Sequence, residues 1–176
     1  KEKILKDKIN KKEIEEKIRK NFTQCWQYFF DYQIPLITRW KKLFGDIEAW
    51  AIWGNCVYNQ NLIMYKALKN NQKHLKSNDT FINKLIEHGN QGLNAMTISE
   101  LTGIPRPTVL RKLKILLERK FLTKDKNNYY LIFGGPETLN YSNDILKKMN
   151  EVDEIRKINE KEFANLVTKI LNIIVL

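Results

Sequence analysis

The sequence predicts a mainly α-helical chain with one small β-hairpin. Both end regions carry apolar residues at spacings of three and four, which is the period of an amphipathic helix. Between them, residues 97–120 show two short helical patterns separated by a glycine. The run at residues 127–131 favours a strand over a helix. We therefore expect helices along most of the chain and a single hairpin near residue 125.

The N-terminal region predicts two long helices. Residues 2–33 favour the first, and Pro35 is expected to interrupt it, because proline lacks a backbone N–H and clashes with the preceding turn. Its apolar face is predicted to hold Ile14, Ile18, Phe22, Cys25 or Trp26, and Phe29. The first half of this helix is mostly charged and carries only a thin apolar stripe. Such a stripe needs a partner surface within the chain or on another subunit. Asp46 is placed to cap the second helix, which is expected to run to about Lys69.

Two less regular segments flank the central pattern. Phe81–Ile86 suggests a short helix that stops near Gly89, and residues 89–94 are expected to form a loop. After Gly134–Pro136 the helical period returns. Two stripes follow, the second stronger than the first: Ile145, Met149, Val152 and Ile155, then Phe163, Leu166, Val167, Ile170, Leu171 and Ile174.

The central pattern begins with a short helix and a tight turn. Thr97 and Glu100 have the Ser/Thr-x-x-Glu spacing of a capping box, in which each side chain binds the other residue's backbone N–H. Gly103 supplies the backbone freedom for a sharp turn. Two short helices joined in this way are typical of a helix-turn-helix.

A second helix is expected from about Arg106 to Lys120. Pro105 and Pro107 suit its first turn, where backbone N–H groups have no partner within the helix. The predicted inward face is Val109, Leu113, Leu116 and Leu117. The residues predicted on or beside the outward face are Thr108, Arg111, Lys112 and Lys114.

A β-hairpin is predicted directly after this helix. Phe121–Thr123 and Tyr129–Phe133 favour strands, and residues 124–128 form a polar tip. A hairpin in this position is the wing of a winged helix-turn-helix. Lys124 and Lys126 are there placed to reach DNA phosphates or the minor groove.

The charge distribution points to the same segment. The net charge of +11 is compatible with a polyanionic partner. A chain crowded with Lys, Asn and Ile is also what an AT-rich genome encodes, so the total alone leaves both explanations open. Residues 93–133, however, carry eight basic and three acidic groups. Residues 21–65 are neutral, yet they hold 12 of the 19 aromatic residues, which indicates a different role.

Residues 97–122 resemble the winged helix-turn-helix of bacterial transcriptional regulators, of the IclR and MarR types. The run Gly103–Leu113, Gly-Ile-Pro-x-x-Thr-Val-x-Arg-x-Leu, is similar to IclR-type sequences in particular. The chain departs from the pattern at Lys120, where a glycine is usual, and it lacks the acidic-x-Arg wing motif of MarR-type proteins. The resemblance implies that Arg106, Pro107, Thr108, Leu110 and Arg111 face DNA. With the outward and wing lysines, the predicted DNA-binding residues are Arg106, Pro107, Thr108, Leu110, Arg111, Lys112, Lys114, Lys124 and Lys126.

The aromatic region is predicted to form a helix core or a subunit interface. The alternative is a small-molecule pocket lined by Trp40, Trp50 and Trp53, which would bind an effector. Cys25 and Cys56 are expected to be buried packing residues. His74 and His88 have no partners at metal-ligand spacing, so we expect no metal and no cofactor.

Several classes of protein are disfavoured. Two cysteines do not make a disulfide-rich secreted scaffold, and no run of about 18 apolar residues is present, so a cytoplasmic protein without a membrane span or signal peptide is expected. The sequence has no Gly-rich phosphate loop, His-Glu-x-x-His motif or nucleophile elbow, so we expect no enzymatic activity.

The leading interpretation is a transcriptional regulator that binds double-stranded DNA sequence-specifically as a homodimer. We predict three regions: 1–88 for dimerisation or sensing, 89–135 for DNA binding, and 136–176 for dimerisation or packing. One alternative is a winged helix that binds a protein. Another is a plasmid or phage replication or partition factor.

Overall fold

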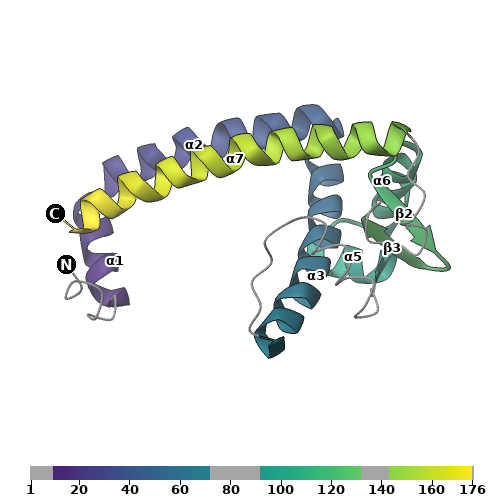
Figure 1. Cartoon of the computed structure of the whole chain (residues 1–176), viewed down its shortest axis with the longest axis horizontal. Helices are drawn as coiled ribbons and strands as arrows, with labels where there is room; N and C mark the ends of the chain where they lie inside the picture. Colours follow the sequence, from purple (N-terminus) through teal and green to yellow (C-terminus); the bar gives the residue numbers. More distant parts are fainter. Residues whose placement is uncertain (1–9, 72–91, 132–142, 176) are drawn as a thin grey trace. The chain divides into compact units, whose positions relative to one another are not determined.

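The computed structural model describes residues 10–71, 92–131 and 143–175 (Figure 1). The predicted helix at 81–86 and both histidines lie outside the described residues. Its helices are α1 (Lys11–Lys20), α2 (Phe22–Phe44), α3 (Ile47–Asn71), α5 (Ala95–Thr102), α6 (Arg106–Glu118) and α7 (Asn143–Val175). A small antiparallel sheet has the order β1 (Leu93–Asn94), β3 (Asn128–Leu131), β2 (Leu122–Asp125). The prediction of a mainly α fold with a winged helix-turn-helix is confirmed.

The chain divides into two compact units, whose boundaries fall inside α2 and α7. The terminal unit comprises residues 1–39 and 153–176, and the central unit comprises residues 40–152. This division differs from the three predicted regions, because α3 packs on α5, α6 and β3 and so joins the winged helix. The two ends of the chain belong to one unit because α2 and α7 pair.

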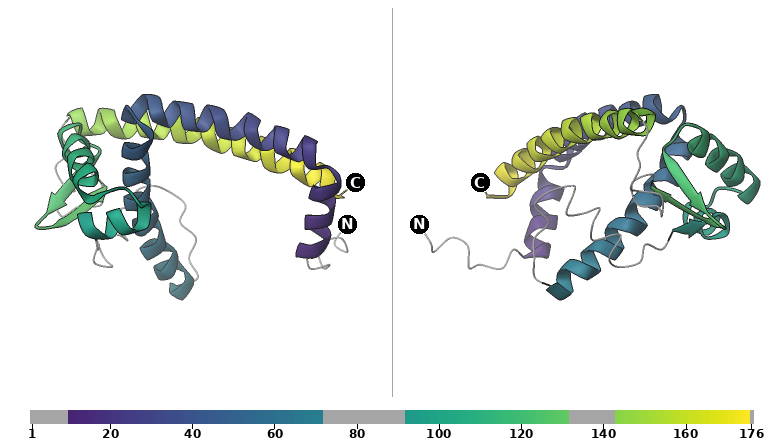
Figure 2. Two further views of the ribbon diagram at one scale, coloured as in Figure 1. Left: turned by 180° about the vertical axis from the view of Figure 1, so that it is seen from behind. Right: turned by 45° about the vertical axis from the view of Figure 1, so that its right-hand side comes forward.

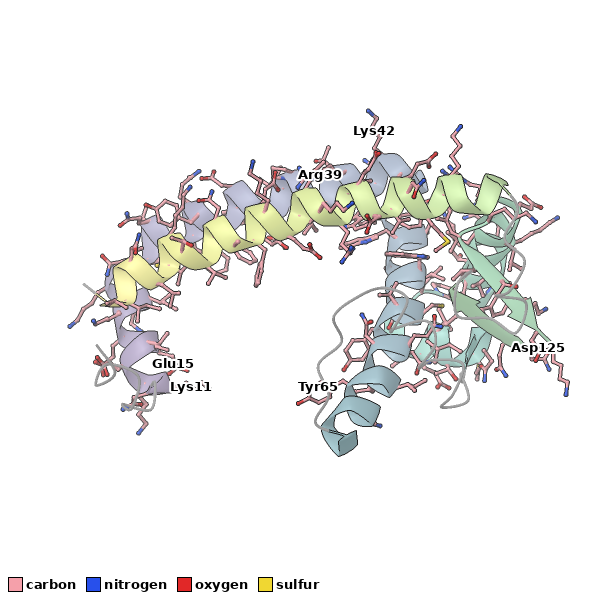
Figure 3. The ribbon with its side chains drawn as sticks, viewed as in Figure 1. Lys11, Glu15, Arg39, Lys42, Tyr65 and Asp125 are labelled. Carbon is pink, nitrogen blue, oxygen red and sulfur yellow. The ribbon has the colours of Figure 1, made fainter. Side chains whose placement is uncertain are left out.

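In the terminal unit, α2 and α7 run side by side in opposite directions (Figures 1 and 2). Arg39 of α2 donates from Nε to Asn159 Oδ1 at 3.0 Å and from Nη1 to Glu162 Oε1 at 3.1 Å (Figure 3). Near the other end, Lys17 Nζ of α1 donates to the carbonyl oxygen of Ile174. Polar contacts from α2 at one end and from α1 at the other therefore hold α7 against the N-terminal helices.

The prediction that Pro35 interrupts the first helix is wrong. α2 continues through Pro35 to Phe44, and the helix break lies at Asn21, which caps α1. A proline inside a helix removes one hydrogen bond. Contacts to α7 on both sides of Pro35 hold α2 together: the rings of Tyr32 and Phe163 are 5.6 Å apart, and Arg39 binds Asn159. Tertiary packing thus outweighs the local preference.

The core of the central unit is aromatic. Phe44 is 2% exposed, and its ring centroid lies 4.9 Å from Trp53 and 4.6 Å from Phe121. Trp40 lies 5.4 Å from Trp53. This core joins the C-terminus of α2, α3 and the residue that enters the wing. Packing accounts for Trp40 and Trp53 without a ligand, whereas Trp50 is half-buried. The small-molecule pocket therefore stays a prediction.

The two cysteines are buried, as predicted, and neither forms a disulfide. Burial raises the pKa of the Cys25 thiol and raises the pKa of Cys56 to about 12. The thiolate is the reactive form of cysteine. Both residues therefore act as apolar packing groups near neutral pH.

Candidate nucleic-acid interface

The N-cap of the short helix α5 lies three residues before the predicted one. Asn94 is the N-cap, and its Oδ1 accepts from the backbone N–H of Thr97 at 2.9 Å. The predicted capping box of Thr97 and Glu100 is therefore wrong. Leu93 and Asn94 also form β1, which pairs with β3, so residues 89–94 are not all loop. Pairing with the wing places Asn94 where it can cap the helix.

The turn between α5 and α6 is built as predicted. Gly103 has a φ of 69°, in the left-handed region that favours glycine. Ser99 Oγ donates to the carbonyl oxygen of Ile104 at 2.7 Å, and the backbone N–H of Ile104 donates to Thr102 Oγ1 at 3.2 Å. These bonds fix the angle at which α6 leaves the turn.

The predicted inward face of α6 is largely confirmed. Val109, Leu113 and Leu116 are each 0% exposed, and Leu117 is half-buried. The helix ends at Glu118 rather than Lys120, with two backbone bonds typical of a Schellman motif. The N–H of Phe121 donates to the Leu116 carbonyl at 2.9 Å, and the N–H of Lys120 donates to the Leu117 carbonyl at 3.1 Å.

Lys120 occupies the left-handed position of this motif, with a φ of 60°. A side chain in this region costs about 1–2 kcal/mol, whereas glycine tolerates it. We expect Lys120→Gly to stabilise the protein by about 0.5–1 kcal/mol, part of the gain being offset by the greater freedom of glycine in the unfolded chain. Thermal unfolding should show a midpoint raised by about 1–4 °C. An unchanged or lower midpoint would mean that Lys120 is not strained.

Lys112 does not lie on the outward face. The prediction is wrong because its side chain is 9% exposed and its ammonium binds Asp46 Oδ2. Glu48 Oε2 lies 3.7 Å from the same ammonium. Asp46 also caps α3, as predicted, because its Oδ1 accepts from the N–H of Ala49 at 2.8 Å. Lys112 thus anchors α6 to the start of α3.

The carboxyl group of Asp46 has a lowered pKa. Burial opposes its ionisation, but the hydrogen bonds from Lys112 and from the N–H of Ala49 outweigh burial. A carboxyl group whose folded pKa is depressed adds stability above its unfolded pKa, about 3.9, and loses it as pH falls towards the folded value.

We therefore expect Asp46→Asn to destabilise the protein at pH 7 and the difference to shrink below about pH 4. Asparagine caps helices as well as aspartate does, so the change isolates the charge. Because Asp46 is 39% exposed, the loss at pH 7 should be on the order of 1 kcal/mol. Urea unfolding at both pH values measures it, with Asp125→Asn at the exposed wing as the control (Figure 3). A difference that is equal at pH 3 and pH 7 would contradict this role.

The wing is a hairpin, as predicted, with a shorter tip. Lys124 pairs with Tyr129 and Asp125 with Asn128, which leaves a two-residue loop at 126–127. Lys126 has a φ of 50° in that loop. Lys124 lies with its ammonium 5.3 Å from the Tyr129 ring centroid, and both lysines are exposed.

A groove of about 400 Å³ lies between α6 and the wing. Three predicted DNA-binding residues, Arg106, Leu110 and Lys124, line it together. The other lining residues are Asn94, Ala95, Met96, Asn127 and Tyr129. Of these, Asn94, Met96 and Asn127 are candidate contacts that the sequence reasoning missed. They come from the start of α5 and the wing tip, which only the pairing of β1 with β3 brings together.

The remaining predicted residues lie outside this groove. Arg111, Lys114 and Lys126 are exposed, as is Pro107, and Thr108 is half-buried. Lys114 Nζ is 3.9 Å from Glu118 in a solvent-exposed pair, which binds weakly.

The helix-turn-helix and its wing also match a known family of domains. Residues 84–126 match the family model of the IclR helix-turn-helix domain. The match runs from before α5 to the wing tip and favours the IclR type over the MarR type. It supports a DNA-binding transcription regulator. No curated protein and no solved structure matches the chain.

The helix-turn-helix with its wing is the most basic segment of the central unit, because residues 93–133 carry eight basic and three acidic groups. Two of its basic residues serve structure: Lys112 binds Asp46, and Arg119 Nη1 donates to the Phe44 carbonyl at 2.8 Å. Within the described residues, no helix is long and apolar enough to cross a membrane. Those residues also show no group of three metal-ligating side chains.

Proposed function

We propose that the protein regulates transcription by binding double-stranded DNA sequence-specifically as a homodimer. The observation that carries this proposal is the groove shared by α6 and the wing of an IclR-type helix-turn-helix. Arg106 stands at the first position of α6, and Lys124 of the wing lines the same groove. A recognition helix enters the major groove with its N-terminal residues, so Arg106 is in the right place to meet base edges.

The side chains divide by chemistry. Arg106 and Arg111 are suited to bidentate hydrogen bonds with guanine. Leu110 is 43% exposed beside Arg106 and is suited to contact a thymine methyl group. Lys124 and Lys126 on the wing are suited to phosphates, which position a protein without reading sequence. The buried Lys112 is left out of the proposed surface.

Selection of bound fragments from random double-stranded DNA tests this function. A homodimer should enrich a palindromic consensus with half-sites about one helical turn apart. Affinity for that consensus should fall steeply with rising salt, because each phosphate contact releases counterions. A lack of any enriched sequence, with weak salt dependence, would favour the protein-binding alternative.

A further inference from the structure

Two rows of large apolar side chains are exposed on the terminal unit. The row on α2 has a spacing of four residues: Phe22 (58% exposed), Trp26 (42%), Phe30 (44%) and Ile34 (60%). The row on α7 has the same spacing: Phe163 (53%), Val167 (38%), Leu171 (46%) and Val175 (78%). Residues four apart lie on one face of a helix, so each row is continuous.

The two rows lie at the same level along the helix pair. Lys17 reaches Ile174, Tyr28 stacks against Lys169 at 4.8 Å, and Arg39 binds Asn159. These contacts set α2 residues 22–34 beside α7 residues 163–175. The rows are therefore neighbours along their whole length.

The rows also lie on the same side of the pair. Cys25 on α2 and Asn159 on α7 are buried and mark where the two helices face each other. Successive residues of a helix are about 100° apart, so each row lies about 40–180° around its helix from that buried position, in the same sense on both helices. Because the helices are antiparallel, equal rotations bring both rows to one side. We call this surface, made of the eight residues above, the apolar face. The same geometry puts the Arg39–Glu162 ion pair and the Tyr28–Lys169 contact on the opposite side.

The apolar face is free of charge. The only charged residue in α2 from 22 to 34 is Asp31, and the only one in α7 from 163 to 175 is Lys169. Asp31 accepts from Gln27 at 2.8 Å, and Lys169 lies on the Tyr28 ring. Neither residue belongs to the rows. A polyanion has nothing to bind on this face, whereas a second uncharged apolar surface can cover it without desolvating a charge.

The exposed area matches that of a dimer interface. Four of the eight side chains are aromatic, a type that buries 150–250 Å² each, and the four aliphatic side chains are somewhat smaller. At about half exposure, the eight together offer on the order of 700 Å². Two such faces would bury about 1,400 Å², within the range of stable protein interfaces. A monomer that leaves so large a continuous patch in water is unusual.

We propose that the apolar face is the homodimer interface, where two copies pack their α2–α7 pairs into a four-helix bundle about a two-fold axis. The proposal rests on the homodimer of the proposed function and assigns its surface. A two-fold interface is formed by the same patch from each copy. The two uncharged rows lie side by side on antiparallel helices, so they can form such a patch.

Two substitutions on α7 make a matched test. Leu171 and Ile158 are both 46% exposed, but Leu171 belongs to the apolar face and Ile158 does not. In sedimentation equilibrium of the full chain without DNA, we expect the wild type and Ile158→Asp to be dimers. Leu171→Asp should raise the dimer dissociation constant at least 100-fold, because it buries an unpaired charge at the interface. Circular dichroism checks that each variant is folded.

Phe30→Ala on α2 is a milder second variant and should weaken the dimer at least tenfold. A monomeric wild type, or equal weakening by Leu171→Asp and Ile158→Asp, would overturn the proposed interface. DNA binding is measured separately on the wild type. A dimer that binds no DNA would refute the proposed DNA binding and leave the interface standing. A monomer that binds DNA would refute the interface and the homodimer and leave the proposed DNA binding standing.

Discussion

Phe44→Ala is expected to lower the free energy of unfolding by about 3–5 kcal/mol, which is the usual loss for removing a fully buried aromatic ring. The ring touches three other aromatic rings, those of Trp40, Trp53 and Phe121. Its removal leaves a cavity between α2, α3 and the entry to the wing. A loss of this size is a large part of the stability of an ordinary domain, about 5–15 kcal/mol.

Urea unfolding followed by circular dichroism measures this loss. Tyr58→Ala is the control, because Tyr58 lies on α3 but is 65% exposed, and it should change stability by less than about 0.5 kcal/mol. DNA binding by Phe44→Ala should fall where the unfolded fraction grows and recover at lower temperature or urea concentration. A loss below about 1 kcal/mol would mean that the aromatic cluster is not the core of the central unit.

Features that depend on a few neighbouring residues were predictable from the sequence. The turn needs a left-handed residue, and Gly103 supplies it. The start of α3 needs an oxygen that accepts from the third backbone N–H along, and Asp46 supplies it. The wing follows from two strand-forming runs around a polar tip. Each of these signals is local, so no distant contact is needed to interpret it.

The errors arose where distant segments decide the structure. Pro35 stays inside a helix because α7, more than 120 residues later, packs on both sides of it. Asn94 displaces Thr97 as the cap because β1 pairs with the wing. The groove between α6 and the wing depends on the same pairing. None of these contacts can be predicted from the local sequence pattern.

Arg111 and Lys112 are the clearest example of a role decided by distant contacts. They are adjacent basic residues on α6, but we expect Arg111 to bind DNA and Lys112 to stabilise the fold. Their side chains point about 100° apart around the helix. Arg111 is exposed, whereas the carboxylates of Asp46 and Glu48 surround Lys112. Sequence alone gave both residues the same role, since the carboxylates lie more than 60 residues earlier.

Alanine at each position should separate the two roles. Arg111→Ala should weaken binding to the selected DNA by about 1–3 kcal/mol, roughly 5- to 150-fold, and leave stability unchanged within about 0.5 kcal/mol. Lys112→Ala should instead lower stability by about 1–3 kcal/mol, because two carboxylates lose their shared cation and the buried aliphatic stem is lost. Under conditions where it is folded, its affinity and salt dependence should match the wild type.

Urea unfolding and DNA titration at several salt concentrations measure both variants. Lys112→Met adds a control, since it keeps the apolar stem and removes only the cation; it should recover part of the stability that Lys112→Ala loses. If Lys112→Ala kept full stability and weakened DNA binding as much as Arg111→Ala, the assignment of Lys112 to the α3–α6 anchor would fail. If Arg111→Ala left affinity unchanged on every duplex, α6 would not be the recognition helix, even with its groove and its charge in place.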